Sequence, residues 1–164
     1  MVNRPIIAAF TLFISACGLM GKPISPSLGT LCGDEEIATA GSEHKVIGRT
    51  LTADHLDYLV RAGTIVRVNV VFTGLTDEHV TTFYFNENGS LTCASDMRRS
   101  FKKGSDPAVV IAAEESSIKV SEGRVSQVAG SRVDAPNLIR QSVEYMSLVK
   151  RAERGEDVTW RGQE

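Results

Sequence analysis

The residues that could do chemistry are the histidines and the carboxylates beside them. Asp77, Glu78 and His79 are consecutive, and Asp54 directly precedes His55, whereas His44 lies in a polar stretch. A histidine beside a carboxylate is the usual pair for acid–base work, and the same groups ligate metals. Adjacent side chains of a strand point to opposite faces, so residues 77–79 could not converge on one site there. We expect a solvated loop at residues 77–79.

Three other groups of side chains have a functional and a simpler interpretation. Glu114 and Glu115 could supply one carboxylate of a catalytic pair, but a solvated turn or strand end fits them better. The aromatic run 83–85 is more typical of a core, with at least one ring turned outward, where a partner could bind. A basic cluster could contact lipid phosphates or an acidic partner, although a solvated loop is the simpler interpretation; it consists of Arg98, Arg99, Lys102 and Lys103.

Sequence motifs for catalysis are absent. The chain has no Gly-x-Ser-x-Gly elbow, phosphate-binding loop, dinucleotide fingerprint or His-Glu-x-x-His pair. It has no Cys-x-x-Cys, and no histidine stands at ligand spacing from a cysteine. We therefore expect no catalytic residues, no metal site and no cofactor. The net charge of −2 and the lack of a basic patch argue against nucleic acid as a partner.

The first 17 residues have the organisation of an export signal. Arg4 supplies a positive start, residues 6–14 are an apolar run, and Ser15 and Ala16 are small. The run is too short to cross a bilayer, which takes about 20 residues. Ile14-Ser15-Ala16-Cys17 resembles the lipobox of bacterial lipoproteins, with Ile in place of the commoner Leu. The resemblance covers only this signal region.

The lipoprotein resemblance implies an anchor at Cys17. In that family the thiol receives a diacylglycerol, the signal is cut before the cysteine, and the new amine is usually acylated. Two or more acyl chains hold a protein stably on a membrane. Gly18, where an aspartate would favour the inner membrane, suggests the outer one. The alternatives are an ordinary signal peptide cut nearby, for example after Gly18, and an uncleaved anchor.

The other two cysteines are predicted to form a disulfide. If Cys17 carries lipid, Cys32 and Cys93 remain as a pair in an oxidising compartment. The alternative is two buried thiols. Removal of residues 1–16 would leave 148 residues, enough for one domain. We divide the chain into a signal peptide (1–16), a Gly- and Pro-containing lipidated tether (17–33), a domain (34–156) and a loose tail (157–164), in which Trp160 could pack back.

The domain shows a helical segment followed by hairpins. After a short helical turn at residues 34–38, residues 51–63 are predicted to form a helix that Thr52 caps and Gly63 ends. Alternating apolar residues predict a strand at 64–73. A second strand at 80–85, a turn at 86–89 and a third strand at 90–94 follow. Residues 97–106 are expected to be a basic loop.

The last third predicts a strand, a hairpin and a long helix. Residues 109–111 favour a strand, and 118–121 pairs with 124–129 around a turn at 122–123. Residues 134–154 form the longest helix candidate, capped by Asp134, with Pro136 in its first turn and Gly155 after its end. This order predicts an α+β fold: a small antiparallel sheet of hairpins, a helix before it, a long C-terminal helix packed on one face, and all helices on that face.

Three functions remain in competition after these observations. The first is a non-enzymatic lipoprotein, facing the periplasm from the outer membrane, that binds another envelope protein as an assembly accessory, inhibitor, or exclusion or immunity factor. The second is a periplasmic carrier of a small or lipidic ligand. The third is a hydrolase of envelope polymers that uses a carboxylate such as Asp77 or Glu114. An anchor at Cys17 is compatible with all three, and we expect the first.

Overall fold

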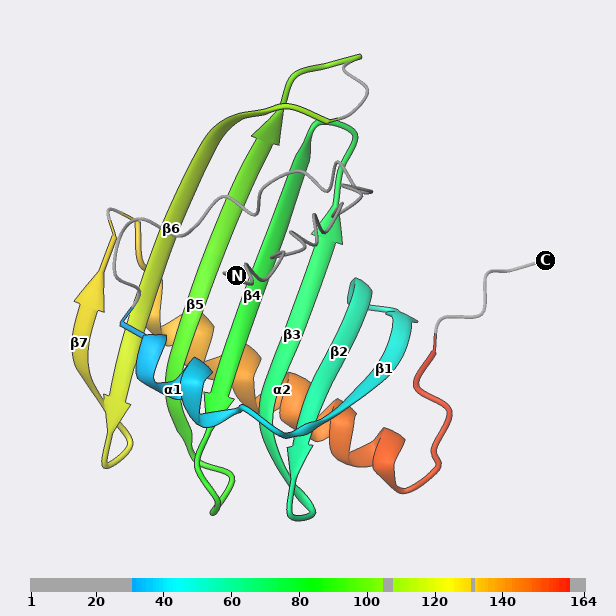
Figure 1. Cartoon of the computed structure of the whole chain (residues 1–164), viewed down its shortest axis with the longest axis vertical. Helices are drawn as coiled ribbons and strands as arrows, with labels where there is room; N and C mark the ends of the chain where they lie inside the picture. The colour runs from blue at the N-terminus through cyan, green and yellow to red at the C-terminus, as the bar shows by residue number, and fades with distance from the viewer. Residues whose placement is uncertain (1–30, 105–107, 131, 160–164) are drawn as a thin grey trace, which may run out of the picture.

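The fold is one antiparallel sheet with a helix on each face. The computed structural model describes residues 31–104, 108–130 and 132–159. Among these residues seven strands pair in chain order, so each strand lies beside its sequence neighbours (Figure 1). A short helix precedes the sheet and a long helix follows it. The elements are α1 (Gly33–Ala38), β1 (Glu43–Thr50), β2 (Ala53–Arg61), β3 (Thr64–Thr73), β4 (Asp77–Phe85), β5 (Leu91–Phe101), β6 (Val110–Ser121), β7 (Arg124–Ala129) and α2 (Ala135–Glu153).

The α+β class, the antiparallel sheet and the C-terminal helix are confirmed. Asp134 caps α2, since its Oδ1 accepts a hydrogen bond from the backbone N–H of Asn137 at 3.1 Å. Pro136 lies in the first turn, as its missing N–H permits. The apolar face of α2 buries Leu138 and Val149 against the sheet. The sheet contributes the other half of this core: Leu56, Tyr58, Val68, Val70, Phe83, Phe85, Ala94 and Ile118.

The helix predicted at residues 51–63 is wrong, because this segment contains strand β2. Gly63 does not end a helix. It follows Ala62 in a two-residue turn between β2 and β3, with φ angles of 49° at Ala62 and 79° at Gly63. Positive φ at both central residues is the signature of the type I′ hairpin turn. Leu51, at the start of the predicted helix, is 80% exposed. Pairing with β1 and β3 outweighs the local helical pattern.

The strands of the second half are longer than predicted. β4 begins at Asp77, so residues 77–79 lie in a strand and not in a solvated loop. β5 continues to Phe101, through much of the segment expected to be a basic loop. Pairing between the two strands explains the extension, since Glu78 lies opposite Arg99 and forms an ion pair with it at 3.1 Å. Opposite charges directly across a strand pair stabilise it.

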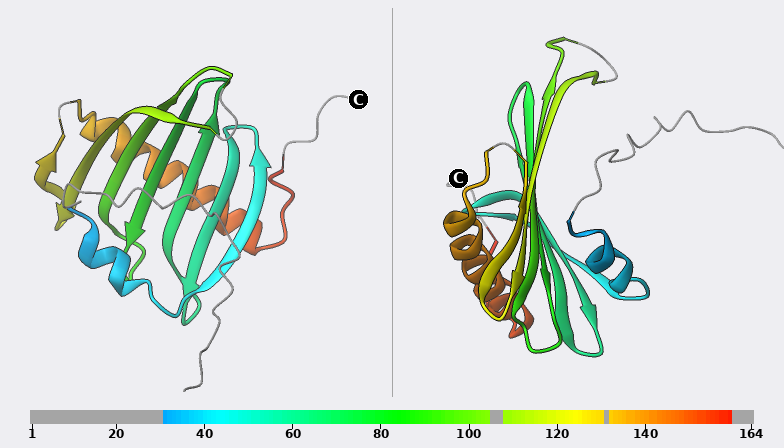
Figure 2. Two further views of the ribbon diagram at one scale, coloured as in Figure 1. Left: turned by 45° about the horizontal axis from the view of Figure 1, so that its top comes forward. Right: turned by 90° about the vertical axis from the view of Figure 1, so that its left-hand side faces the viewer.

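The two helices lie on opposite faces of the sheet, which corrects the prediction of a single helical face. Figure 2 shows α1 on one side of the sheet and α2 on the other. The alternation along the strands agrees, because Phe83 and Ala94 point into the α2 core while Tyr84 and Cys93 form a separate buried cluster with Cys32. We call these the α2 face and the α1 face.

The predicted disulfide is confirmed between Cys32 and Cys93, whose Cα atoms are 5.6 Å apart. It fixes the residue before α1 to strand β5, and both cysteines are buried. The signal peptide 1–16, Cys17 and the tether up to residue 30 lie outside the described residues, as does Trp160. Within the tail, Thr159 forms an isolated antiparallel bridge with Thr50.

Candidate functional site

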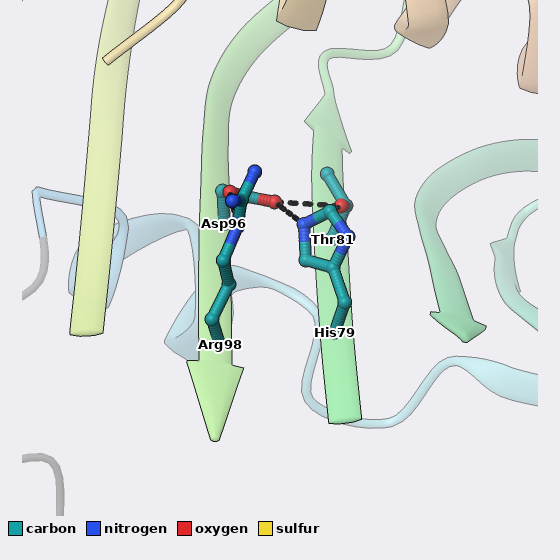
Figure 3. Close-up of polar contacts among 4 residues, drawn as sticks. All are labelled: His79, Thr81, Asp96 and Arg98. Atoms are coloured by element: carbon teal, nitrogen blue, oxygen red, sulfur yellow. Dashed lines mark hydrogen bonds and ion pairs between the residues drawn. The ribbon is translucent and has the colours of Figure 1, made fainter. Parts of the chain in front are cut away.

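A polar cluster lies on the α2 face, beyond the part of the sheet that α2 covers. Figure 1 shows α2 crossing behind the lower part of the sheet, with β3 to β6 extending above it. On this upper part, Thr81 lies opposite Asp96, and His79 opposite Arg98. All four share the face of Phe83 because they are even steps away along the two strands. Figure 3 shows the four side chains converging between β4 and β5.

The carboxylate of Asp96 is the centre of this His79 cluster. Its Oδ1 is hydrogen-bonded to Nε2 of His79. The same oxygen accepts a second hydrogen bond from Oγ1 of Thr81 at 2.9 Å. Nε of Arg98 lies 3.7 Å from Oδ2. The imidazole of His79 also stacks on Phe72, with ring centroids 5.8 Å apart. The histidine is therefore oriented by a carboxylate on one edge and by an aromatic ring on its face.

The surroundings keep Asp96 ionised. Burial on its own would raise the pKa of this carboxyl group. The hydrogen bond and charge of His79, the hydroxyl of Thr81 and the charge of Arg98 outweigh burial, and the pKa of Asp96 is lowered. An ionised carboxylate that holds an imidazole is a partner for proton transfer, but such chemistry also needs a place for a substrate beside the imidazole.

The lowered pKa of Asp96 predicts a change in acid stability. A carboxylate whose pKa falls on folding stabilises the protein above its unfolded pKa, and this contribution is lost as the pH falls through the folded pKa. Asn in place of Asp96 keeps the shape and removes the titration. We expect wild type to lose stability more steeply than Asp96→Asn below the ordinary aspartate pKa of 3.8. Urea unfolding of both proteins between about pH 2 and pH 6 measures this, and parallel curves would contradict it.

A second polar cluster lies on the α1 face. Nε2 of His44 and Nε2 of His55 are each 3.3 Å from a different oxygen of Asp57. Asn69 donates from Nδ2 to Asp57 at 3.1 Å and accepts a hydrogen bond from Thr82 at 3.0 Å. These residues start a polar row across the sheet. Its members are successive partners in the strand register: Asp57, Asn69, Thr82, Ser95 and Ser117.

The Asp57 row satisfies buried and half-buried polar groups on the α1 face. Asp57 is 7% exposed; Asn69 donates a hydrogen bond to one of its oxygens, and Nε2 of each flanking histidine lies 3.3 Å from the carboxylate. Within the ranges that the structure describes, no three His, Cys, Asp or Glu side chains are grouped to hold a metal ion. The geometry of the row is that of a hydrogen-bonded surface.

The structure separates the residues that were adjacent in the sequence. Glu78 pairs with Arg99 at 3.1 Å on the α1 face, while His79 pairs with Asp96 on the α2 face. Arg98 and Arg99 are divided between the faces in the same way, so they do not form one basic patch. Glu114 and Glu115 lie within β6, also on opposite faces.

Asp96 and Asp57 were missed by the sequence analysis. Asp96 is 17 residues from His79, and only the β4–β5 register brings the two together. Asp57 meets His44 through the pairing of β1 and β2. His55 and Asp57 share a face because they are two residues apart in a strand, a signal that the predicted helix concealed.

Two hollows flank α2 near the hairpin turns. One of about 510 Å³ lies between α2 and the β4–β5 and β6–β7 turns, and the next, of about 400 Å³, reaches the β2–β3 turn. Both are lined by Met146, Lys150 and Arg154. The first adds apolar walls from Leu91, Val120, Ile139 and Val143. Its lining thus combines an apolar wall with a cationic end.

Comparison with known proteins finds no match: no protein-family model, no curated protein and no solved structure corresponds to this chain. Among the described residues, neither helix combines the length and apolar character that crossing a membrane would require.

Proposed function

We propose that this chain is a lipid-anchored protein of the bacterial envelope that binds another envelope protein and performs no catalysis. Its anchor is the lipid on Cys17, and the domain faces the periplasm from the outer membrane. The observation that carries the binding role is the placement of two partly buried polar clusters, one on each face of the sheet. The His79 cluster lies above α2, and the Asp57 row lies on the opposite face. Surfaces of this kind suit a macromolecular partner better than a small substrate.

The anchor is tested first with Cys17→Ser. Loss of the thiol removes the attachment point of the lipid, so the variant should leave the membrane pellet, while wild type stays in it after a high-salt wash. Ser27→Ala, a change in the same tether, is the matched control and should remain anchored. Intact mass should show a lipid-sized increase in wild type and in Ser27→Ala, and none in Cys17→Ser. Retention of Cys17→Ser in the pellet would contradict the anchor.

The partner is tested by photocrosslinking in cells. A photoreactive residue at Arg98 probes the α2 face, one at Met97 probes the α1 face, and one at Leu75 probes the exposed β3–β4 connection as a control. We expect one defined adduct from a sheet face, absent at Leu75 and dependent on Cys17. Absence of an adduct from both faces and from the edges of the sheet would remove the proposed function.

The hollows beside α2 support a second candidate, the carrier of a lipidic ligand. Their apolar wall and the cations Lys150 and Arg154 fit an acyl chain with an anionic head. Organic extraction of protein purified from membranes, with mass spectrometry of the extract, separates this candidate from the first. A stoichiometric lipid that Val143→Asp abolishes would favour the carrier, because Val143 lines the first hollow and is 66% exposed.

A further inference from the structure

The outer edge of β6 is paired along only half of its length. β7 pairs with β6 from Ser117 to Ser121, and Figure 1 shows β7 beside only the lower part of β6. The chain leaves the sheet at Gly130, which has a φ of 100°, and a Cβ there would lie 2.6 Å from the backbone oxygen of Glu115. Among the described residues, positions 110–115 therefore have β5 on one side and no strand on the other.

The opposite edge of the sheet, β1, is protected. Its pairing with β2 is interrupted by register shifts around Gly48, and Thr50 is bridged by Thr159. Lys45 donates from Nζ to both carboxylate oxygens of Glu153 on α2, at 3.1 and 3.2 Å. Bulges, charges and covering segments are the devices that keep an edge from pairing with another chain. On the upper β6 edge, no described segment covers residues 110–114, and the one irregularity is a register shift with β5 at Ile111, opposite Ser100 and Phe101.

The side chains along this free edge change character from one end to the other. Val110 and Ile111 are apolar, and Ile111 is 65% exposed. Two alanines follow, and then come Glu114 and Glu115. Neither glutamate forms a salt bridge within the described residues. The neighbouring arginines of β5 are engaged elsewhere, Arg98 with Asp96 and Arg99 with Glu78.

We propose that the free edge of β6, residues 110–115, accepts an extended segment of the partner protein as an added antiparallel strand. This deepens the proposed function and rests on it. Alternate residues of an edge strand point their backbone N–H and C=O groups outward, and these groups would form hydrogen bonds with the added strand. The segment carries Lys or Arg opposite Glu114 and Glu115, and apolar residues opposite Val110 and Ile111. Because the added strand runs antiparallel to β6, its basic residues lie N-terminal to its apolar residues.

A second copy of this chain does not fit the same edge. Two β6 edges paired antiparallel about residues 112 and 113 place Glu115 opposite Val110, and Glu114 opposite Ile111. That register sets carboxylates against apolar side chains. Moving the centre toward the glutamates sets like charges opposite one another, which destabilises a strand pair. The two glutamates thus disfavour both of these self-pairings and favour a basic segment.

The test uses the full-length lipidated protein in detergent micelles and a labelled peptide, acetyl-Lys-Arg-Thr-Ala-Val-Val-amide. Fluorescence anisotropy measures binding, and hydrogen exchange with mass spectrometry locates it. Among the amides of residues 110–115, we expect those that point away from β5 to exchange quickly without peptide and to slow when it binds, while those of 117–121 are protected throughout. The variant Glu114→Lys/Glu115→Lys should bind the peptide about tenfold more weakly.

Charge-matched controls make the result specific. Glu87→Lys/Glu122→Lys makes the same change of charge on exposed hairpin turns away from the edge, and it should bind like wild type. A peptide with Glu-Glu in place of Lys-Arg should restore binding to Glu114→Lys/Glu115→Lys. Equal binding of the Lys-Arg peptide by wild type and by that variant, or no binding by either, overturns the proposal.

Hydrogen exchange separates this proposal from the proposed function. If the edge amides of residues 110–115 are protected without peptide, and this protection increases with protein concentration, the edge pairs with a second copy of the chain. That result overturns the proposal of an added strand from a partner protein. If the peptide does not bind while an envelope protein still crosslinks at Arg98 or Met97, the edge proposal fails and the proposed function stands. Loss of every envelope adduct removes the proposed function, whatever the peptide does.

Discussion

Replacing both Cys32 and Cys93 with alanine should lower the free energy of unfolding by about 4 kcal/mol, because the bond closes a long loop in the unfolded chain. The two cysteines are 61 residues apart in sequence. The bond also attaches α1 to the sheet, and the buried cluster around it is small, with Tyr84 and Leu31 as its other apolar members. Chemical denaturation of the oxidised protein and of the double variant measures the loss.

Loss of the disulfide should destabilise mainly the region around α1. Without the bond, α1 should exchange its amide hydrogens much faster, whereas the core under α2 should stay protected, since α2 packs on the other face of the sheet. Reduced wild-type protein is the matched control and should behave like the double variant. A double variant as stable as oxidised wild type would show that the bond contributes nothing to the fold.

Phe83→Ala should destabilise the protein by about 3–5 kcal/mol, the usual cost of removing a buried aromatic ring. Phe83 is fully buried in the middle of the α2 face. Its ring stacks on Tyr145 of α2, with centroids 6.1 Å apart, so the substitution opens a cavity at the contact between helix and sheet. Thermal and urea unfolding measure the effect.

Two further variants serve as controls for Phe83→Ala. Leu75→Ala removes a comparable amount of apolar surface from a side chain that is fully exposed in the β3–β4 connection, and its stability should equal that of wild type. Phe83→Leu keeps much of the buried volume and should fall between wild type and Phe83→Ala. Similar losses for Leu75→Ala and Phe83→Ala would mean that Phe83 is not part of the core.

Hairpins and the C-terminal helix could be predicted because their signals are local. Alternation in residues 64–73, the turn around Asn86 to Gly89, and the Asp134 cap each depend on residues within a few positions. The cysteine pairing was also accessible, because an even number of thiols remained once Cys17 was assigned to the lipid. The anchor at Cys17 stays a prediction.

The helix expected at residues 51–63 shows the limit of such local signals. Thr52 and Gly63 resemble a cap and a stop, but Gly63 belongs equally well to a two-residue hairpin turn. Only the partners on both sides decide between these structures. Once β1 and β3 pair with β2, its backbone groups are satisfied in the sheet and Leu56 and Tyr58 enter the core.

The amino-acid sequence by itself determined the hairpins at residues 80–94 and 118–129, the α+β class, the C-terminal helix and the cysteine pair. Tertiary structure decided which polar residues meet. His79 reaches Asp96, and His44 reaches Asp57, only through strand register, and a shift of one residue would send each side chain to the other face. The open half of β6 was likewise decided in three dimensions, because it depends on where β7 ends and the chain leaves at Gly130.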